Sequence, residues 1–329
     1  MNEKILITGG SGLLGSYLIR WFMQRGYINI SATYQGTAET IPADIRAGVN
    51  WSKLVLPDKE AALDTIAGHD WVIHSAGLVS YATRDKYRLL EINKTGTEHI
   101  VNACMAHGVS HLVYIGSIAS LGRETDHVIL NEKSPWLDNE FSTAYGLSKY
   151  LGELEAWRGA AEGLDVSVVL PSVMLGAGDW HRSSLQIVNR VVHKAGWYPG
   201  GQTGFVDVRD VARFTASLLE KNQPGERWLL NAMDMPYAQF YQKLAEQLGL
   251  KKKFSLAPKW LARTILAGSS LLKGGSLGQE MINQAYGTFA YDAAHSLTVQ
   301  GFSYRDMEET LRDVAGAYLS RKKDSFLPF

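Results

Sequence analysis

The sequence predicts an α/β fold with a doubly wound parallel sheet, followed by a smaller, mainly helical C-terminal lobe. Two observations support this prediction. A glycine-rich turn joins a short apolar run to a helical pattern within residues 4–24, and strand-like runs then alternate with helical patterns as far as residue 170. Such alternation is typical of a parallel sheet with helices on both faces. The 329 residues are enough to form this sheet and a second, smaller body.

Each expected element follows from its local pattern. Short runs of apolar and β-branched residues predict strands, and longer mixed runs predict helices. The expected strands are 4–8, 28–33, 51–56, 70–74, 111–115 and 166–170, and the expected helices are 13–24, 58–67, 85–107 and 142–161. After Pro171 we expect a helix at 183–195, a strand at 205–208 that enters a helix with Asp210 near its start, a strand at 227–230, and mainly helical structure over 236–319.

The turn after the first expected strand carries three evenly spaced glycines, Gly9, Gly12 and Gly15. Gly9 permits a tight turn, Gly12 lets a diphosphate approach the main chain, and Gly15 lets the helix pack close to the strand. The helix begins at Leu13 and Leu14, and its free N–H groups and dipole attract the negative charge of a diphosphate. The pattern therefore predicts a dinucleotide site, with an ordinary glycine-rich turn as the alternative.

This order of elements suggests two regions. We expect a dinucleotide-binding domain over 1–170, to which 205–231 returns, and a substrate-binding lobe made of 171–204 and 232–329. In open parallel sheets the ligand lies at the carboxyl ends of the strands, near the point where the strand order reverses. We therefore expect the site at that edge of the sheet.

Composition narrows the functional classes. The 33 basic residues balance the 33 acidic residues, and no long basic run predicts a nucleic-acid partner. The single cysteine, Cys104, lies in an expected helix and fits a core position in a reducing compartment. The sequence starts with a strand and has no apolar stretch of about 20 residues, so we expect neither a signal peptide nor a membrane span. The default expectation is a cytoplasmic protein without a metal site.

Tyr145 and Lys149 are four residues apart in an expected helix, so their side chains share one face. A free phenol has a pKa near 10 and burial raises that pKa further, so a tyrosine with a lowered pKa needs a positive charge beside it. Lys149 supplies such a charge. The same spacing recurs in Tyr318 and Lys322, where the polar C-terminal surroundings indicate a chance match.

Ser117 lies just after the expected strand 111–115, at the edge where such a sheet presents its ligands. Its hydroxyl is suited to hydrogen-bond and orient a substrate carbonyl. The alternative is that Ser117 only caps the end of the strand, and Ser120 is a weaker substitute for the same role. His74 ends another expected strand, and we interpret it as structural rather than catalytic.

These motifs occur in an order that resembles the extended short-chain dehydrogenases/reductases, a family with a Rossmann fold. The similarity covers roughly residues 1–215. Besides the glycine turn, Ser117, Tyr145 and Lys149, it rests on Asn93 and on the runs 75–77, 170–173 and 204–212.

The resemblance implies a role for each of these positions. Tyr145 would be the acid/base, Lys149 would lower its pKa and hold the nicotinamide ribose, and Ser117 would polarise the substrate oxygen. Asn93 would support the site through its backbone. Further positions would contact the cofactor or line its nicotinamide end: Ser75, Ala76, Gly77, Pro171 and Val173. The resemblance also implies a homodimer formed by the helices 85–107 and 142–161.

The residues after the second expected strand select between dinucleotides. A carboxylate there binds the free ribose 2′-hydroxyl of NAD, and an arginine accommodates the 2′-phosphate of NADP. This chain has neither, and the neighbouring residues are Ser31, Tyr34 and Gln35. Because no carboxylate repels a phosphate, we expect NADP, with NAD as the alternative.

Two enzymatic functions compete. The first is NADP-dependent reduction of a carbonyl in a small hydrophobic substrate, as in the dihydroflavonol reductases that the chain resembles, with Tyr145 as proton donor. The second is an NAD-dependent nucleotide-sugar epimerase or dehydratase. Such enzymes often carry an arginine before the strand 205–208, and its absence from 202–204 favours the reductase. A non-enzymatic dinucleotide-sensing protein is a third alternative, against which the intact Ser117, Tyr145 and Lys149 argue.

Overall fold

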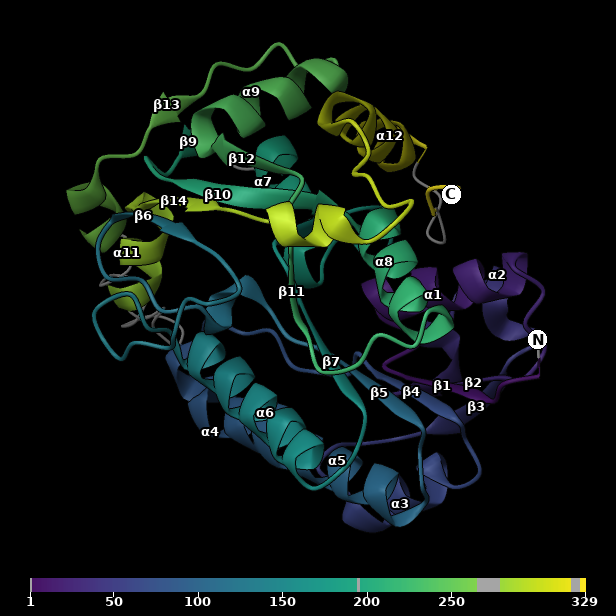
Figure 1. Cartoon of the computed structure of the whole chain (residues 1–329). Coiled ribbons are helices and arrows are strands. Elements are labelled where there is room, and N and C mark those ends of the chain that lie inside the picture. The colour runs from purple at the N-terminus through teal and green to yellow at the C-terminus, as the bar shows by residue number, and fades with distance from the viewer. Residues whose placement is uncertain (1, 194–195, 265–278, 321–325) are drawn as a thin grey trace.

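The computed structural model describes residues 2–193, 196–264, 279–320 and 326–329, and Figure 1 shows how its elements are arranged. At its centre is a parallel sheet of seven strands in the order β3-β2-β1-β4-β5-β7-β11. The strands are β1 (Ile5–Thr8), β2 (Ile30–Tyr34), β3 (Asn50–Lys53), β4 (Trp71–His74), β5 (His111–Ile115), β7 (Val166–Pro171) and β11 (Arg227–Leu230). The predicted doubly wound parallel sheet is confirmed.

The strand order reverses between β1 and β4, which are neighbours in the sheet. Thr8 and His74 are the last residues of these two strands, and they pair in register. The loops that follow the two strands lead in opposite directions, so a crevice for a ligand is expected at this point.

Helices cover both faces of this sheet. α1 and α8 pack against each other on one face, and α3, α5 and α6 lie on the other (Figure 1). Within the described residues, no helix is both long and apolar enough to cross a membrane. The helices are α1 (Leu13–Gln24), α2 (Ala43–Arg46), α3 (Lys59–Ile66), α4 (Lys86–Leu90), α5 (Gly96–Ala106), α6 (Ala144–Ala161), α7 (Gln186–His193), α8 (Val208–Glu220), α9 (Tyr237–Gln247), α11 (Gln279–Tyr286) and α12 (Met307–Leu319).

A second sheet has the order β12-β10-β14-β6, and β8 pairs with β10. Figure 1 shows this sheet beside α9 and α12 in the upper part of the molecule. Its strands are β6 (His127–Leu130), β8 (Val173–Leu175), β10 (Gln202–Asp207), β12 (Met233–Pro236) and β14 (Thr288–Tyr291), and β9 (Trp197–Tyr198) pairs separately with β13 (Ser255–Leu256). The strand expected at 205–208 therefore lies in this second sheet, whereas β11 returns to the first.

The lobe contains more strand than the sequence pattern indicated. β6 and β14 are only four residues long each, and they pair with each other although they are far apart in the sequence. Such short, non-local pairs leave little local pattern to detect. The helix expected at 183–195 is α7, preceded by a 3₁₀ turn at Ser183–Leu185, and residues 194 and 195 lie outside the described residues.

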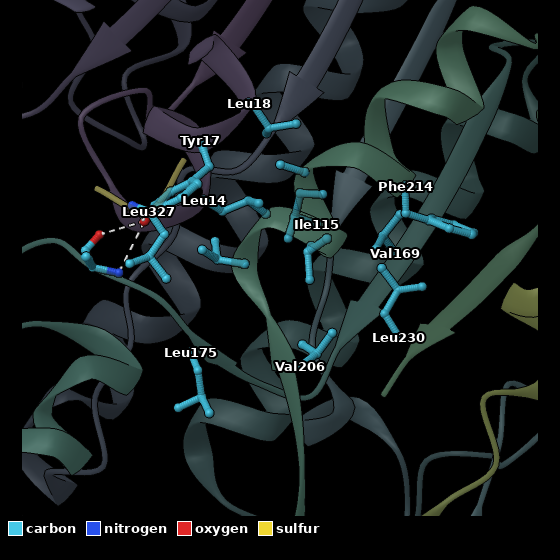
Figure 2. Packing of buried hydrophobic residues seen from close by; sticks show 14 of the residues in the cluster. Leu14, Tyr17, Leu18, Ile115, Val169, Leu175, Val206, Phe214, Leu230 and Leu327 are labelled. Atoms are coloured by element: carbon cyan, nitrogen blue, oxygen red, sulfur yellow. Dashed lines mark hydrogen bonds between the residues drawn. The ribbon is translucent and has the colours of Figure 1, made fainter. Parts of the chain in front are cut away.

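Tyr17 of α1 connects three parts of the chain within the core (Figure 2). Its buried hydroxyl accepts hydrogen bonds from the N–H groups of Leu327 and Ala177, at 2.7 and 3.2 Å, and donates to the Ala177 carbonyl at 3.3 Å. Leu14 and Leu175 belong to the same apolar cluster. Burial raises the pKa of Tyr17, which keeps this hydroxyl neutral. The C-terminal residues are thereby held against the first helix.

Candidate active site

The turn between β1 and α1 leaves no room for side chains. Gly9 has a φ of +70°, which favours glycine, and a Cβ there would lie 2.8 Å from the Cα of Ala76. A Cβ at Gly15 would lie 2.3 Å from the carbonyl oxygen of Gly9. A side chain at either position would therefore push α1 or the loop after β4 out of place. The tight turn and the close helix packing expected from these glycines are both present.

The first N–H groups of α1 are not capped by a side chain. Gly12 is the residue before the helix, and the first helical N–H groups include those of Leu13 and Leu14. A helix of 12 residues carries a positive partial charge at this end. The glycine cradle and the uncapped N–H groups together fit the diphosphate of a nicotinamide dinucleotide.

Thr33, rather than Ser31, contacts the glycine turn from β2. The Thr33 hydroxyl accepts a hydrogen bond from the N–H of Gly9 at 3.0 Å. Ser31 is the second of the five residues of β2 and lies about 10 Å before the end of that strand. We therefore withdraw Ser31 as a cofactor contact. Tyr34 ends the strand and Gln35 follows it, so both lie at the carboxyl end of β2, where the ribose is expected.

Lys53 is a neighbour of Tyr34 that the sequence analysis missed. It is the last residue of β3 and pairs in register with Tyr34. Its side chain is exposed and forms no ion pair with the part of the chain that the structure describes. No local signal could have singled it out, because only the strand register places it beside Tyr34.

Ser117 and Tyr145 converge from two different elements. Ser117 follows β5 and begins a short 3₁₀ turn, in which the N–H of Ala119 donates to its Oγ at 3.1 Å. Tyr145 lies in the first turn of α6, whose start is capped by Thr143. The hydroxyl of Ser117 lies close enough to the phenol of Tyr145 to act on its pKa. Ser117 thus caps a turn, as its alternative interpretation holds, and also reaches Tyr145.

The phenol of Tyr145 is buried, and burial raises its pKa above the ordinary value of 10. Tyr81, whose ring centroid lies 5.7 Å from that of Tyr145, also raises this pKa, and the nearby Ser117 hydroxyl lowers it. In the protein by itself burial outweighs the influences that lower this pKa, so the lowering by Lys149 stays a prediction for the site with its dinucleotide. Tyr145 is therefore a neutral phenol, the form that carries a proton to donate.

Lys149 is held between β5 and α6. Its Nζ donates to the carbonyl oxygen of Ile115 at 2.6 Å and lies 4.7 Å from the centroid of the Tyr114 ring. Burial lowers the pKa of Lys149 to about 8, and the carboxylate of Glu153, one turn along α6, raises it. An anionic group beside Lys149 therefore raises its pKa and favours its charged form.

Asn93 lies in an interruption of the helix expected over 85–107. A π-helical stretch, Glu91–Thr95, separates α4 from α5, and such stretches are frequent at functional sites. The Asn93 side chain clamps Leu78: Oδ1 accepts from its N–H at 2.7 Å, and Nδ2 donates to its carbonyl at 2.9 Å. Nδ2 also donates to the Oγ of Ser148 at 2.9 Å. The side chain of Asn93 thus joins the loop after β4 to the helix that carries Lys149.

The loop after β4 passes between the glycine turn and these side chains. A Cβ at Gly77 would lie 3.1 Å from the Oδ1 of Asn93 and 3.8 Å from the Nζ of Lys149. The N–H of Ala76 donates to the Oγ1 of Thr8 at 3.2 Å. The loop contains three predicted cofactor positions, Ser75, Ala76 and Gly77.

Pro171 ends β7 and Val173 begins β8, so both lie where the chain passes from the first sheet to the second. Between them, Ser172 is 5% exposed, and its hydroxyl has no hydrogen-bond partner among the described residues. A buried hydroxyl without a partner is costly, so a ligand group that reaches Ser172 would be stabilised. This observation fits the predicted nicotinamide end of the site.

The sequence analysis also missed the aromatic side chains near Tyr145. The ring of Tyr81 contacts the ring of Tyr145 directly. The charges of Arg123 and Arg190 lower the pKa of Tyr81, against the effect of its burial. Tyr237 lies at the start of α9, where Tyr81 raises its pKa and Arg190 lowers it. These side chains come from separate loops and helices and meet only in the folded chain. Tyr81 and Tyr237 thus add aromatic side chains to the surroundings of Tyr145.

Comparison with known proteins places this geometry in a family. The NAD dependent epimerase/dehydratase family matches residues 5–230, which is more than half of the chain. The chain is 31% identical to tetraketide alpha-pyrone reductase 2 of Arabidopsis thaliana, over 68% of this chain and 75% of that protein. It is 22% identical to anthocyanidin reductase of Arabidopsis thaliana, over 87% of this chain and 93% of that protein.

A solved structure shares the fold. The Bordetella bronchiseptica enzyme WbmG, in complex with NAD and UDP, is similar with a TM-score of 0.77 and 18% identity, over 99% of this chain and 97% of that chain. At this identity the likeness concerns the fold alone. The family match and the reductase relatives show that the chain belongs to the NAD dependent epimerase/dehydratase family and is an NAD(P)-dependent oxidoreductase of the extended short-chain dehydrogenase/reductase type.

Proposed function

We propose that the protein reduces a carbonyl group of a small hydrophobic substrate with NADPH, and that Tyr145 donates the proton. The observation that carries this proposal is the approach of the Ser117 hydroxyl to the Tyr145 phenol, on the helix that also carries the buried Lys149. Two neighbouring hydroxyls can bind one carbonyl oxygen together.

The proposed roles follow from the chemistry of each side chain. The dinucleotide, when bound, supplies the hydride. Ser117 orients the carbonyl oxygen, and the neutral Tyr145 transfers its proton to that oxygen as negative charge develops there. Because the phenol is buried, the phenolate left behind would be costly without a nearby cation. The ammonium of Lys149 supplies this charge and moderates that cost.

The surroundings of Tyr145 favour a hydrophobic substrate. Tyr81 stands edge-on to the Tyr145 ring, and Tyr237 belongs to the same group of side chains. Two of the reductases similar to this chain are named for ring compounds, an alpha-pyrone and an anthocyanidin. A ring of that kind would pack well against tyrosine side chains.

The ends of β2 and β3 favour NADP over NAD. Gln35 and Gly36, which directly follow β2, carry no carboxylate, and the exposed Lys53 lies beside Tyr34 in the sheet. An ammonium at this edge would pair with the 2′-phosphate, which NAD lacks. We propose Tyr34, Gln35 and Lys53 as neighbours of that phosphate, with NAD as the alternative cofactor.

A nucleotide-sugar epimerase or dehydratase that uses NAD is the second candidate function. Its support is the fold shared with WbmG, which was solved with NAD and UDP. Against it, 202–204 offers no cation for a diphosphate, and the Gln202 side chain donates to the carbonyl of Phe289 at 3.3 Å. A Cβ at Gly204 would lie 2.1 Å from the Oδ1 of Asn231, so little space is left there for a ligand group.

We further propose a homodimer formed by α4, α5 and α6. α5 and α6 pack side by side, and α4 contacts α6 (Figure 1). Tyr87 on α4 is 80% exposed and Leu154 on α6 is 44% exposed, so both would gain from burial against a second copy. Analytical ultracentrifugation at micromolar concentration tests this proposal, and a monomer would refute it.

The function is tested by incubating the protein with NADPH and a panel of hydrophobic ketones and aldehydes. We expect oxidation of NADPH by at least one of them, and much slower oxidation with the Tyr145→Phe variant, which still binds NADPH. A parallel incubation with UDP-sugars tests the second candidate. Epimerised sugar without net consumption of dinucleotide would contradict the reductase.

A further inference from the structure

His74, the last residue of β4, is the centre of a buried chain of hydrogen bonds. Its Nδ1 lies 2.8 Å from the Oγ1 of Thr8, and that oxygen also accepts from the N–H of Ala76 at 3.2 Å. Its Nε2 lies 3.0 Å from the Oγ1 of Thr97, and Thr97 donates to the main-chain carbonyl of Asn93 at 2.6 Å. The exposed fractions of Thr8, His74, Thr97 and Asn93 are 0, 1, 1 and 2%. This series of hydrogen bonds thus joins β1 to the π-helical stretch inside the protein.

The directions of these hydrogen bonds decide which ring nitrogen carries the proton. The Thr97 hydroxyl has a single proton and donates it, so its oxygen accepts from the Nε2–H of His74. Nδ1 then carries no proton and accepts from the hydroxyl of Thr8. Burial, assisted by the charge of Lys149, lowers the pKa of His74 to about 3, which keeps the ring neutral.

A second branch leads from Thr97 to α6. The Tyr114 hydroxyl contacts Thr97 and donates to the main-chain carbonyl of Lys149 at 3.2 Å. One turn further along α6, a Cβ at Gly152 would lie 2.4 Å from the carbonyl oxygen of Asn93 and 2.6 Å from the Oη of Tyr114. The helix that carries the candidate catalytic residues therefore packs directly against Asn93 and Tyr114, which are linked to His74 through Thr97.

We propose that His74 is a positioning residue of the candidate active site. Its ring holds Thr8 and Thr97 at a fixed separation, and Thr97 in turn fixes the segment whose Asn93 side chain clamps Leu78. The ring itself touches neither the substrate nor the reacting atoms. The kinetic part of this inference rests on the proposed reductase function, whereas the tautomer of His74 does not depend on it.

The kinetic test compares two substitutions of Thr97. Thr97→Val keeps the shape but removes the hydroxyl, so we expect kcat to fall by about 10- to 100-fold, as for a misplacement of about 1 Å. We expect a much smaller change in the Kd of NADPH, because the diphosphate cradle lies on the Thr8 side. Thr97→Ser keeps the hydroxyl and should restore most of kcat. Thr215→Val is the matched control, because Thr215 is fully buried and its hydroxyl has no partner among the described residues.

Two substitutions of His74 separate the branches. The amide nitrogen of His74→Gln can replace Nε2–H toward Thr97, whereas the side-chain oxygen of His74→Asn can replace Nδ1 toward Thr8. Because the Thr97 branch leads to Asn93, we expect His74→Gln to keep more of kcat than His74→Asn. Melting temperatures measured in parallel show whether both variants are folded.

Two kinetic outcomes overturn the proposal. One is a wild-type kcat in folded Thr97→Val, and the other is an equal loss of kcat in Thr97→Val and Thr215→Val. A folded His74→Asn variant with a higher kcat than His74→Gln would also contradict it.

Nuclear magnetic resonance of ring-¹⁵N-labelled histidine tests the inference without any turnover. We expect the His74 ring, assigned by its loss in His74→Gln, to be an Nε2–H tautomer that does not titrate between about pH 5 and about pH 9. An Nδ1–H tautomer or a titrating ring would overturn the proposal. If the wild-type protein reduces no carbonyl, the proposed function fails. The measured tautomer of His74 still shows whether its ring makes the proposed hydrogen bonds to Thr8 and Thr97.

Discussion

The ammonium of Lys149 donates a 2.6 Å hydrogen bond to the main-chain carbonyl of Ile115 and thereby ties helix α6 to the end of strand β5. Ile115 lies two residues before Ser117, so this contact also keeps the ammonium near the hydroxyl pair of Ser117 and Tyr145. The position is buried, and burial lowers the pKa of Lys149 to about 8.

This pKa predicts that dinucleotide affinity depends on pH. In the free protein Lys149 is charged below about pH 8 and neutral above it, so the Kd of NADPH should rise as the pH passes through about 8. The Glu153 carboxylate raises this pKa, so Glu153→Gln should move the transition to lower pH. Fluorescence titrations with NADPH from about pH 6 to about pH 10 measure both effects. A transition that moves to higher pH in Glu153→Gln would show that the two groups are not coupled in this way.

Removing the phenolic hydroxyl tests the proton donor. Tyr145→Phe keeps the ring but has no proton to donate, so we expect kcat to fall by about 10²- to 10⁴-fold with little change in the Kd of NADPH. Tyr87→Phe is the control, because Tyr87 is 80% exposed on α4. Turnover by Tyr145→Phe at the wild-type rate would contradict the proposal that Tyr145 donates the proton.

Two helical glycines differ in the space around them. Gly152→Ala would place a Cβ 2.4 Å from the carbonyl oxygen of Asn93, so we expect a loss of about 1–3 kcal/mol in the free energy of unfolding. A Cβ at Gly316 in α12 would meet nothing within 4 Å, so Gly316→Ala should stabilise the protein by up to about 1 kcal/mol. Denaturant unfolding measures both. A neutral Gly152→Ala would mean that α6 is able to move away from the π-helical stretch.

The proposed 2′-phosphate contact has its own test. Lys53→Gln removes a cation without changing the strand, and we expect the Kd of NADPH to rise by about two- to tenfold while the Kd of NADH stays the same. Lys251→Gln, an exposed lysine of the lobe, is the matched control. An equal change in the Kd of both dinucleotides would place Lys53 away from the 2′-phosphate.

The first half of the fold could be predicted because its signals are local. The pattern gave α1, β5 and β11 with the bounds that the structure shows, since a glycine turn or a run of buried apolar residues marks each of them. β6 gave no such signal, because three of its four residues are exposed or half-buried and its partner β14 is far away in the sequence. The π-helical stretch around Asn93 was missed for a similar reason, since the pattern on both sides of it is helical.

The residues of the candidate site that belong to sequence motifs could be predicted. Ser117, Tyr145 and Lys149 were found from their positions after a strand and along a helix, and the structure brings them together. Tyr81 and Lys53 were not found, because only the folded chain places Tyr81 against Tyr145 and Lys53 beside Tyr34. How far burial raises the pKa of Tyr145 could not be predicted, since the extent of its burial depends on the whole pocket.

The most direct test of the central claim is to denature the purified protein and identify any released nucleotide by mass spectrometry. A reductase exchanges its dinucleotide in every turnover, whereas an epimerase regenerates it and is able to retain it. We predict an empty site or weakly held NADP. NAD released in a one-to-one ratio to protein would contradict the proposed reductase and support the nucleotide-sugar enzyme.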